Sequence, residues 1–246
     1  MAGHSKWSNI KHKKAKTDAQ RAKIFTKIGK EISVAIREGG PDPATNSKLR
    51  DLITKAKSQN VPNDNIDRII KRAVGDDSIV YEEITYEGYG PGGVAVIVEV
   101  TTDNRNRAAG EVRHIFDKYG GNLGVTGSVG FLFTDKGIIV IEKDEEQEID
   151  GEKLMETAIM AGAEDFSSEG DVYEITTDPA QLSAVRNDVE AAGYEILSAE
   201  VEKIPSTYIT LTDEEVIKNM QSILDNFDDN DDVTDVYHNW ENSDEE

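Results

Sequence analysis

The sequence contains no cysteine and only 4 histidines among its 246 residues. Without cysteine, a disulfide framework, a thiolate metal site and a cysteine nucleophile are all excluded. His4 and His12 lie near the N-terminus, His114 and His238 are far apart in the sequence, and no pair has ligand spacing on one helix face. The sequence therefore predicts no metal centre and no other cofactor.

Long apolar runs are also missing. The longest purely apolar runs are short, such as residues 94–98 and 138–141, whereas a membrane-spanning helix needs roughly 20 residues. The basic start of the chain leads into a charged amphipathic helix instead of the apolar stretch of a secretory signal. We therefore expect a cytoplasmic protein without a membrane partner.

Recognisable catalytic patterns are absent as well. Gly88, Gly90 and Gly93 match the G-x-G-x-x-G string of dinucleotide sites, but they precede a predicted strand, so a hairpin turn is the expected role. The acidic segment 228–233 resembles the start of a calcium loop but has Val233 in place of the required glycine. We expect a protein that is not an enzyme and takes no small-molecule substrate.

Charge is divided unequally along the chain. The formal net charge is −22, yet residues 1–75 hold 17 basic and 7 acidic residues, a balance of +10. The rest holds 10 basic and 42 acidic residues, a balance of −32. A basic end of this density predicts a polyanionic partner. The acidic remainder either serves solubility alone or repels nucleic acid and confines contact to chosen patches.

Lysines are concentrated in the first thirty residues. Residues 1–16 are poor in apolar side chains, as expected of a mobile arm. Trp7 either pins this arm onto the following helices or stacks on an exposed base. A helix predicted over 17–39 places apolar residues on one face and a lysine stripe nearly opposite. The candidate contacts are the arm residues Lys6, Trp7, Lys11, Lys13 and Lys14, and the lysine stripe, Lys16, Lys23, Lys27 and Lys30.

Hydrophobic periodicity predicts the domain organisation. Helical patterns over 17–39, 46–59 and 63–75 indicate a small bundle. Strand patterns follow at 80–87, 93–101 and 128–134, with a helix at 104–118. The next segments read strand, helix, strand, strand, helix, strand, a split βαβ unit of ferredoxin-like kind, over 137–142, 151–160, 163–168, 171–177, 179–192 and 194–203.

The block before residue 135 is one helix short of such a unit. The tail after residue 205 offers a strand, a helix and a strand over 207–211, 213–227 and 233–238. We therefore predict an α+β fold: an N-terminal three-helix bundle followed by two ferredoxin-like α/β domains, the second inserted into the first. The predicted domains are the basic bundle with its arm at 1–76, the middle domain at 77–134 plus 206–246, and the inserted βαββαβ domain at 135–205.

Segment 101–116 carries three of the ten basic residues that follow the first 75, namely Arg105, Arg107 and Arg113. Asp103 or Asn104 can cap the helix predicted there. Arginine near a helix start opposes the helix dipole, so a reason other than local stability is expected. Either these arginines pair with surface acids, or they contact phosphate or RNA backbone beside the glycine-rich segment 120–130.

Five strings occur at specific spacing and cover about half of the chain: GHSKWSNIKHKK, KIFTKIGKEI, GGPDPATNSKLRDLITKAKSQNVPNDNIDRIIKRAVG, YEGYGPGGVAVIVEVTTDNRNR and GGNLGVTGSVGFLF. With them the chain resembles the YebC/PmpR family, to which the mitochondrial translational activator of cytochrome oxidase also belongs. The resemblance implies three domains and a cytoplasmic, non-enzymatic regulatory factor. Ala108 departs from the pattern, since the family often has threonine after NRNR.

Two functions fit these features. The first is a DNA-binding regulator of transcription, whose lysines contact phosphates with mostly sequence-independent, steeply salt-dependent affinity. No helix rich in arginine, asparagine and glutamine is evident, so weak base readout is expected. The alternative is a ribosome- or RNA-associated translation factor that assists synthesis of difficult, proline-rich sequences, with the arm on ribosomal RNA and the NRNR loop at a second site. The resemblance includes members of both kinds.

Overall fold

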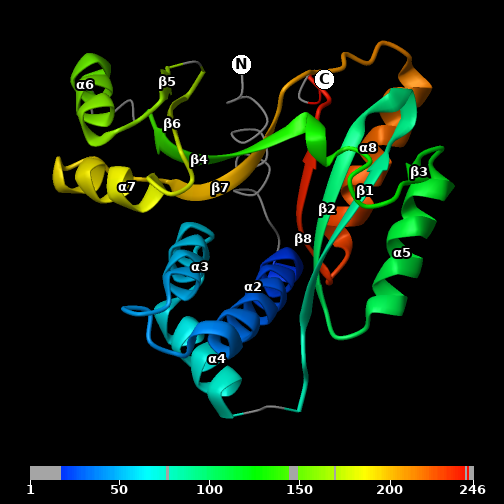
Figure 1. Cartoon of the computed structure of the whole chain (residues 1–246), viewed down its shortest axis with the longest axis horizontal. Helices are drawn as coiled ribbons and strands as arrows, with labels where there is room; N and C mark the ends of the chain where they lie inside the picture. The colour runs from blue at the N-terminus through cyan, green and yellow to red at the C-terminus, as the bar shows by residue number, and fades with distance from the viewer. Residues whose placement is uncertain (1–17, 76–77, 144–148, 169, 242, 244–246) are drawn as a thin grey trace. The chain divides into compact units, whose positions relative to one another are not determined.

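The computed structural model describes residues 18–75, 78–143, 149–168, 170–241 and 243. These residues form two compact units (Figure 1). One is Thr134–Ile204; the other comprises the described residues up to Phe133 and those from Pro205 onward. The chain thus leaves the larger unit once and returns to complete it. The predicted α+β fold with an inserted second α/β domain is confirmed.

The N-terminal bundle consists of α2 (Asp18–Gly39), α3 (Ser47–Ser58) and α4 (Asn63–Gly75). Apolar residues at helical spacing meet in one core, because each helix presents a single apolar stripe. The buried members of this core are Ile28, Ile32, Ala35, Ile36, Leu49, Leu52, Ala56, Val61 and Ile66. The bundle is therefore a packed body and not a set of separate basic helices.

Asn46 holds the turn between α2 and α3. Its Oδ1 accepts a hydrogen bond from the Leu49 amide at 3.0 Å, and its Nδ2 donates to the carbonyls of Ala35 and Gly40, both at 2.8 Å. The residue is 5% exposed. A Cβ on Gly39 would lie 2.8 Å from the Asn46 side chain, so only glycine fits there.

We predict that Asn46→Ala lowers the free energy of unfolding by about 2 kcal/mol, the upper end of the N-cap range, because two carbonyls also lose their donor. Urea unfolding followed by circular dichroism measures this. Ser47→Ala is the control: Ser47 is the exposed first residue of α3, and a change within about 0.5 kcal/mol is expected. Equal effects of both changes would contradict the assignment.

The middle domain contains a four-stranded sheet with the order β3-β1-β2-β8. Its strands and helices are β1 (Glu82–Tyr89), β2 (Ala95–Thr102), α5 (Arg105–Lys118), β3 (Asn122–Leu123), α8 (Glu214–Asp229) and β8 (Val233–His238). Both helices share one core with alternate side chains of β2, which include Val96, Val98 and Val100. Ala108 is 1% exposed in this core. A threonine hydroxyl there would face the sheet and not a ligand.

The β1–β2 connection is the predicted hairpin turn. It contains the short 3-10 helix η1 (Pro91–Gly93), in which Gly92 and Gly93 have φ of 72° and 80°. These are left-handed values that favour glycine. A Cβ on Gly88, a member of the glycine string, would also lie 2.6 Å from the Asn122 carbonyl oxygen. The glycine string thus serves turn geometry and close packing, as predicted.

Two predicted strands are wrong. Residues 128–134 do not form the third strand of the middle sheet; they contain the 3-10 helix η2 (Gly130–Leu132), and the chain extends only from Phe133. The amides of Val129 and Gly130 bond the Glu87 side chain, and those of Ser128 and Leu132 bond nearby backbone carbonyls, instead of a neighbouring strand. Residues 207–211 form only an isolated bridge between Ile209 and Trp240.

The inserted unit has the strand order β5-β6-β4-β7. Its elements are β4 (Phe133–Glu142), α6 (Gly151–Ala161), β5 (Asp165–Ser167), β6 (Val172–Thr177), α7 (Leu182–Ala191) and β7 (Ser198–Pro205). Leu154 of α6 and Val185 of α7 are buried in one core with Ile139 and Ile175 of the sheet. This is the predicted ferredoxin-like arrangement. Among the described residues, no helix is long and apolar enough to span a membrane.

Candidate nucleic-acid interface

The candidate contacts in the arm cannot be placed. Lys6, Trp7, Lys11, Lys13 and Lys14, together with Lys16 of the lysine stripe, lie outside the described residues. The other stripe residues, Lys23, Lys27 and Lys30, are on α2. Arg105, Arg107 and Arg113 are on α5. A segment formed by the last residues of α8 and those that follow it contacts members of both groups.

That segment is the acidic turn, residues 228–232, and it faces the lysine stripe. Lys23 Nζ donates to the carbonyl and to Oδ1 of Asp229, at 3.0 and 2.7 Å. Lys27 Nζ donates to the Asp228 carbonyl at 2.7 Å. The last carbonyls of a helix lack intrahelical donors and carry the negative end of its dipole, so lysines are favourable partners. The hydrogen bond to Asp229, aided by the nearby aspartates, raises the pKa of Lys23.

Asp232 is the buried centre of this contact. Its side chain is 7% exposed and accepts from Lys30 Nζ, from an Arg107 guanidinium nitrogen at 2.7 Å and from Thr102 Oγ1 at 2.8 Å. Burial raises the pKa of Asp232, but these three donors outweigh it, so the pKa lies below its ordinary value. One carboxylate thereby joins α2, the start of α5 and the end of β2.

The α5 arginines differ from one another. Asn104 caps the helix by accepting from the Arg107 amide at 3.1 Å. Arg107 also pairs with Asp103 at 2.7 Å, and its bonds to Asp232 and Asp103 raise its pKa. Arg105 Nε lies 3.6 Å from Glu82. Arg113 is exposed and has no acidic partner within the described part of the chain. Pairing with acidic residues therefore accounts for Arg105 and Arg107, two of the three candidate arginines.

The glycine-rich segment beside α5 uses its amides internally. Glu87 is 8% exposed, and its carboxylate accepts from the amides of Gly127 at 2.7 Å, Val129 at 2.8 Å and Gly130 at 2.6 Å. Burial raises the pKa of Glu87, but these donors outweigh it and leave the pKa below its ordinary value. A phosphate would need the same amides, so this part of the segment is not an open anion cradle.

Three exposed cations on α4 were missed by the sequence reasoning. Arg68, Lys71 and Arg72 are exposed side chains of this helix and, over the residues that the structure describes, have no acidic partner. Arg68 and Arg72 are four residues apart and so lie on the same helix face. Helical spacing in the sequence was the available signal, but it did not show that α2 would face them.

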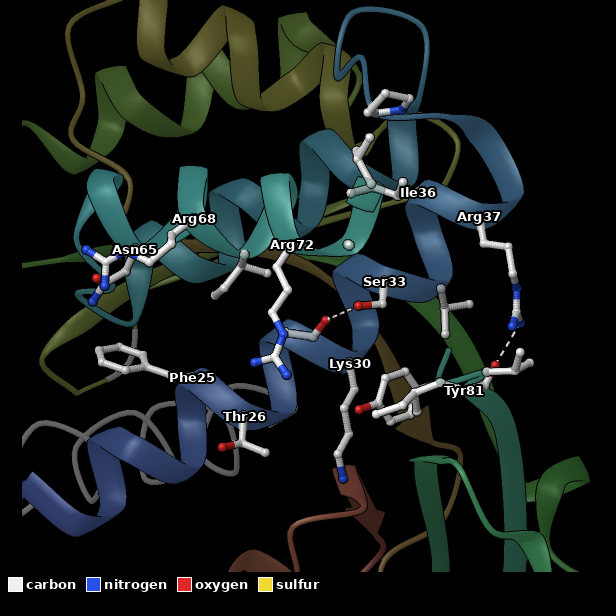
Figure 2. Close-up of a pocket in the computed structure, with 18 residues that line it drawn as sticks. Phe25, Thr26, Lys30, Ser33, Ile36, Arg37, Asn65, Arg68, Arg72 and Tyr81 are labelled. Atoms are coloured by element: carbon white, nitrogen blue, oxygen red, sulfur yellow. Dashed lines mark hydrogen bonds between the residues drawn. The ribbon is translucent and has the colours of Figure 1, made fainter. Parts of the chain in front are cut away.

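A groove of about 830 Å³ separates α2, α4 and residues 79–81. Figure 2 shows Arg72 extending from α4 toward α2, with Arg68 beside Asn65. Arg37 lies on the opposite side, where it donates to the Tyr81 carbonyl at 2.7 Å. The apolar side chains that line the groove are Phe25, Val34, Ile36, Ile69, Ala73, Val74, Ile79 and Val80. The groove thus combines an apolar floor with arginines at its edge.

The acidic turn is not arranged as a metal site. Its aspartates bond lysines and an arginine, as described above. Among the described residues, no group of three or more histidine or carboxylate side chains is placed to hold a metal ion. What the geometry offers is anion binding by arginine next to an apolar surface.

Comparison with known proteins gives the family. The protein-family model described as "TACO1/YebC protein N-terminal domain" matches residues 5–76 of the sequence. A second family model, described as "TACO1/YebC second and third domain", matches residues 81–240. A relative from Acetivibrio thermocellus, named "Probable transcriptional regulatory protein", is 59% identical over 241 residues, 98% of this chain and 99% of the relative. A relative of the same name from Caldicellulosiruptor bescii is 58% identical and covers 100% of both chains.

The structural comparison agrees. The crystal structure of a conserved hypothetical protein from Aquifex aeolicus is similar with a TM-score of 0.82 and 44% identity, over 92% of this chain and 93% of that chain. The two family models together match most of the sequence. The relatives carry the name of regulatory proteins and not of enzymes. The resemblance seen in the sequence is confirmed: this chain belongs to the TACO1/YebC family.

Proposed function

We propose that this protein is a non-enzymatic regulatory factor that binds a nucleic acid through its N-terminal bundle and arm. The observation that carries the proposal is the position of its unpaired cations. In a chain with a net charge of −22, Arg68, Lys71 and Arg72 are exposed on one helix and have no carboxylate partner over the described ranges. Cations gathered in this way on an acidic chain favour contact with a polyanion.

The arm and α4 make the main contacts in this proposal. Lys6, Lys11, Lys13 and Lys14 bind phosphates, and Trp7 stacks on a base. The lysine stripe contributes through Lys16, while Lys23, Lys27 and Lys30 reach a polyanion only where it displaces the acidic turn. On α5, Arg113 has its charge available, whereas Arg105 and Arg107 share theirs with acids.

The first form of the proposal is a DNA-binding regulator of transcription, in keeping with the name of the relatives. The alternative is an RNA- or ribosome-associated translation factor. One observation favours the alternative. Asn65, Arg68 and Arg72, the residues on α4 best suited to base or phosphate contact, line a hollow. A recognition helix must instead protrude to enter the major groove of DNA, about 12 Å wide.

Salt dependence tests the shared part of the proposal. We predict that the logarithm of the association constant for labelled polyanions falls linearly with the logarithm of salt concentration, and that Lys13→Glu/Lys14→Glu makes the slope shallower by about 1.4 to 1.8, for two lost phosphate contacts. Fluorescence anisotropy with duplex DNA and single-stranded RNA measures this. Lys153→Glu, a substitution at an exposed position on α6, is the control and should leave the slope unchanged. An affinity that ignores salt would contradict the proposal.

Sedimentation of a cell lysate separates the two forms. Co-migration with ribosomes that survives DNase and is lost with Lys13→Glu/Lys14→Glu favours the translation factor. Tight, sequence-selective binding to defined duplex DNA that is abolished by the same substitutions favours the transcription regulator. The cytoplasmic location expected from the sequence stays a prediction.

A further inference from the structure

We propose that the groove between α2 and α4 binds an unpaired segment of nucleic acid, with a base against its apolar floor and phosphates on Arg68 and Arg72. This inference rests on the proposed function and specifies the form of the ligand. It concerns a site on the face of α4 that points toward α2. Among the described residues of the lysine stripe, only Lys30 lines this site.

The apolar floor is open to solvent. Val74, Ile79 and Val80 are 55%, 46% and 56% exposed, although each is a large aliphatic residue. Phe25 and Ile69 lie on the same lining and are only half-buried. A contiguous apolar surface of this kind, with polar residues at its edge, is typical of a binding site. Nucleobases have flat apolar faces that can cover it.

The charges at the edge suit phosphates. Arg68 and Arg72 project from successive turns of α4, about 5–6 Å apart at Cβ. A guanidinium group can bind phosphate through two parallel hydrogen bonds. Arg37 adds a third positive charge, since its hydrogen-bond partner is the neutral Tyr81 carbonyl. Lys30 is excluded from this set because Asp232 neutralises it.

The shape of the groove favours an unpaired strand over a duplex. Its volume of about 830 Å³ lies within the range of about 300–1,000 Å³ found for sites that enclose small molecules. In a duplex the bases are stacked inside and present only their edges, so no base face can lie on the floor. The Asn65 amide and the Ser33 and Thr26 hydroxyls also line the groove and can bond a base edge.

An acidic peptide could pair with the same arginines, but its apolar and anionic groups come from different residues. A nucleotide joins one phosphate to one flat apolar face, the combination that the groove presents side by side. The observations therefore favour nucleic acid, and a peptide ligand is an outcome that the experiment can reveal.

The test compares substitutions inside and outside the groove on the full-length protein. Arg68→Gln/Arg72→Gln removes the two edge charges. Lys153→Gln/Lys218→Gln removes equal charge from exposed positions on α6 and α8 that do not line the groove. With labelled oligouridylate, the groove variant is expected to bind about tenfold or more weakly, with a salt slope shallower by about 1.4, for two lost single-strand contacts. The control variant is expected to bind within about threefold of the unmodified protein.

A second readout locates the base. Methyl resonances of Ile69, Ile79 and Val80 should shift on addition of oligouridylate and stay unchanged with a blunt-ended, fully paired DNA duplex. If the unmodified protein binds oligouridylate but both double variants bind alike, the groove inference falls while the proposed function stands. If it binds no nucleic acid, the proposed function fails first. Methyl shifts with polyglutamate but not with oligouridylate would assign the groove to an acidic peptide.

Discussion

Replacement of Asp232 by alanine is expected to lower the free energy of unfolding by about 3–5 kcal/mol, the usual cost of removing one partner from a buried ion pair. Lys30, whose side chain is 12% exposed, would lose its carboxylate, and Thr102 Oγ1 would lose its acceptor. Arg107 would keep its ion pair with Asp103, and its side chain is 43% exposed, so the loss of its bond to Asp232 contributes less to the destabilisation. Urea unfolding at neutral pH measures the change.

The pH dependence of this effect has a defined sign. The folded-state pKa of Asp232 is lowered, so its contribution to stability is full above the unfolded-state pKa of about 3.9 and is lost as pH falls through the folded-state value. The stability difference between the unmodified protein and Asp232→Ala should therefore be constant near neutrality and shrink in acid. Asp231→Asn, an exposed neighbour, should change stability by less than about 0.5 kcal/mol. Equal effects at both positions would contradict the role of Asp232.

Glu87→Gln is expected to destabilise the protein by about 3 kcal/mol and to loosen the segment after β3, because three amides depend on one carboxylate. A glutamine offers one acceptor oxygen, and its amide group donates where an acceptor is needed. The amide protons of Gly127, Val129 and Gly130 should then exchange with solvent about a hundredfold faster, as expected where their hydrogen bonds no longer protect them. Hydrogen exchange followed by NMR measures this residue by residue.

Glu83 on the same strand provides the control. Its carboxylate is 43% exposed and pairs with Lys48 at the surface, so Glu83→Gln should cost less than about 1 kcal/mol and leave these three amides protected. If Glu87→Gln left their exchange rates unchanged, the carboxylate would not be what orders the segment.

Features governed by neighbouring residues could be predicted from the sequence. The α3 helix is flanked by Asn46 and Gln59, the residues at which the pattern placed its ends. Asn104 caps α5 as one of two predicted candidates. The return of the chain to the middle sheet was predicted from missing elements, and β8 has the predicted bounds. In each case the interaction that sets the boundary joins residues a few positions apart in the sequence, or the element follows from a repeating hydrophobic pattern.

Features governed by distant partners could not be predicted. The lysine stripe was read as free because Lys23 and Asp229 are 206 positions apart. Glu87 and Asp232 are two among 49 acidic residues, and nothing local marks them as buried. The strand predicted at 128–134 failed because Glu87, 42 positions before Val129, binds the amides of Val129 and Gly130. The importance of Arg68 and Arg72 appears only once α2 and α4 are packed.

The position of the acidic turn near the C-terminus has a consequence for synthesis of the chain. A ribosome makes residues 18–39 long before residues 228–238, so the newly made α2 carries Lys23, Lys27 and Lys30 without their partners for most of translation. The edge of β2 that pairs with β8 is also uncovered during that time. Unpaired apolar strand edges promote aggregation. Residues 228–238 therefore both pair with the lysines of α2 and cover the edge of β2, and a chain that terminates before residue 228 would keep both surfaces exposed.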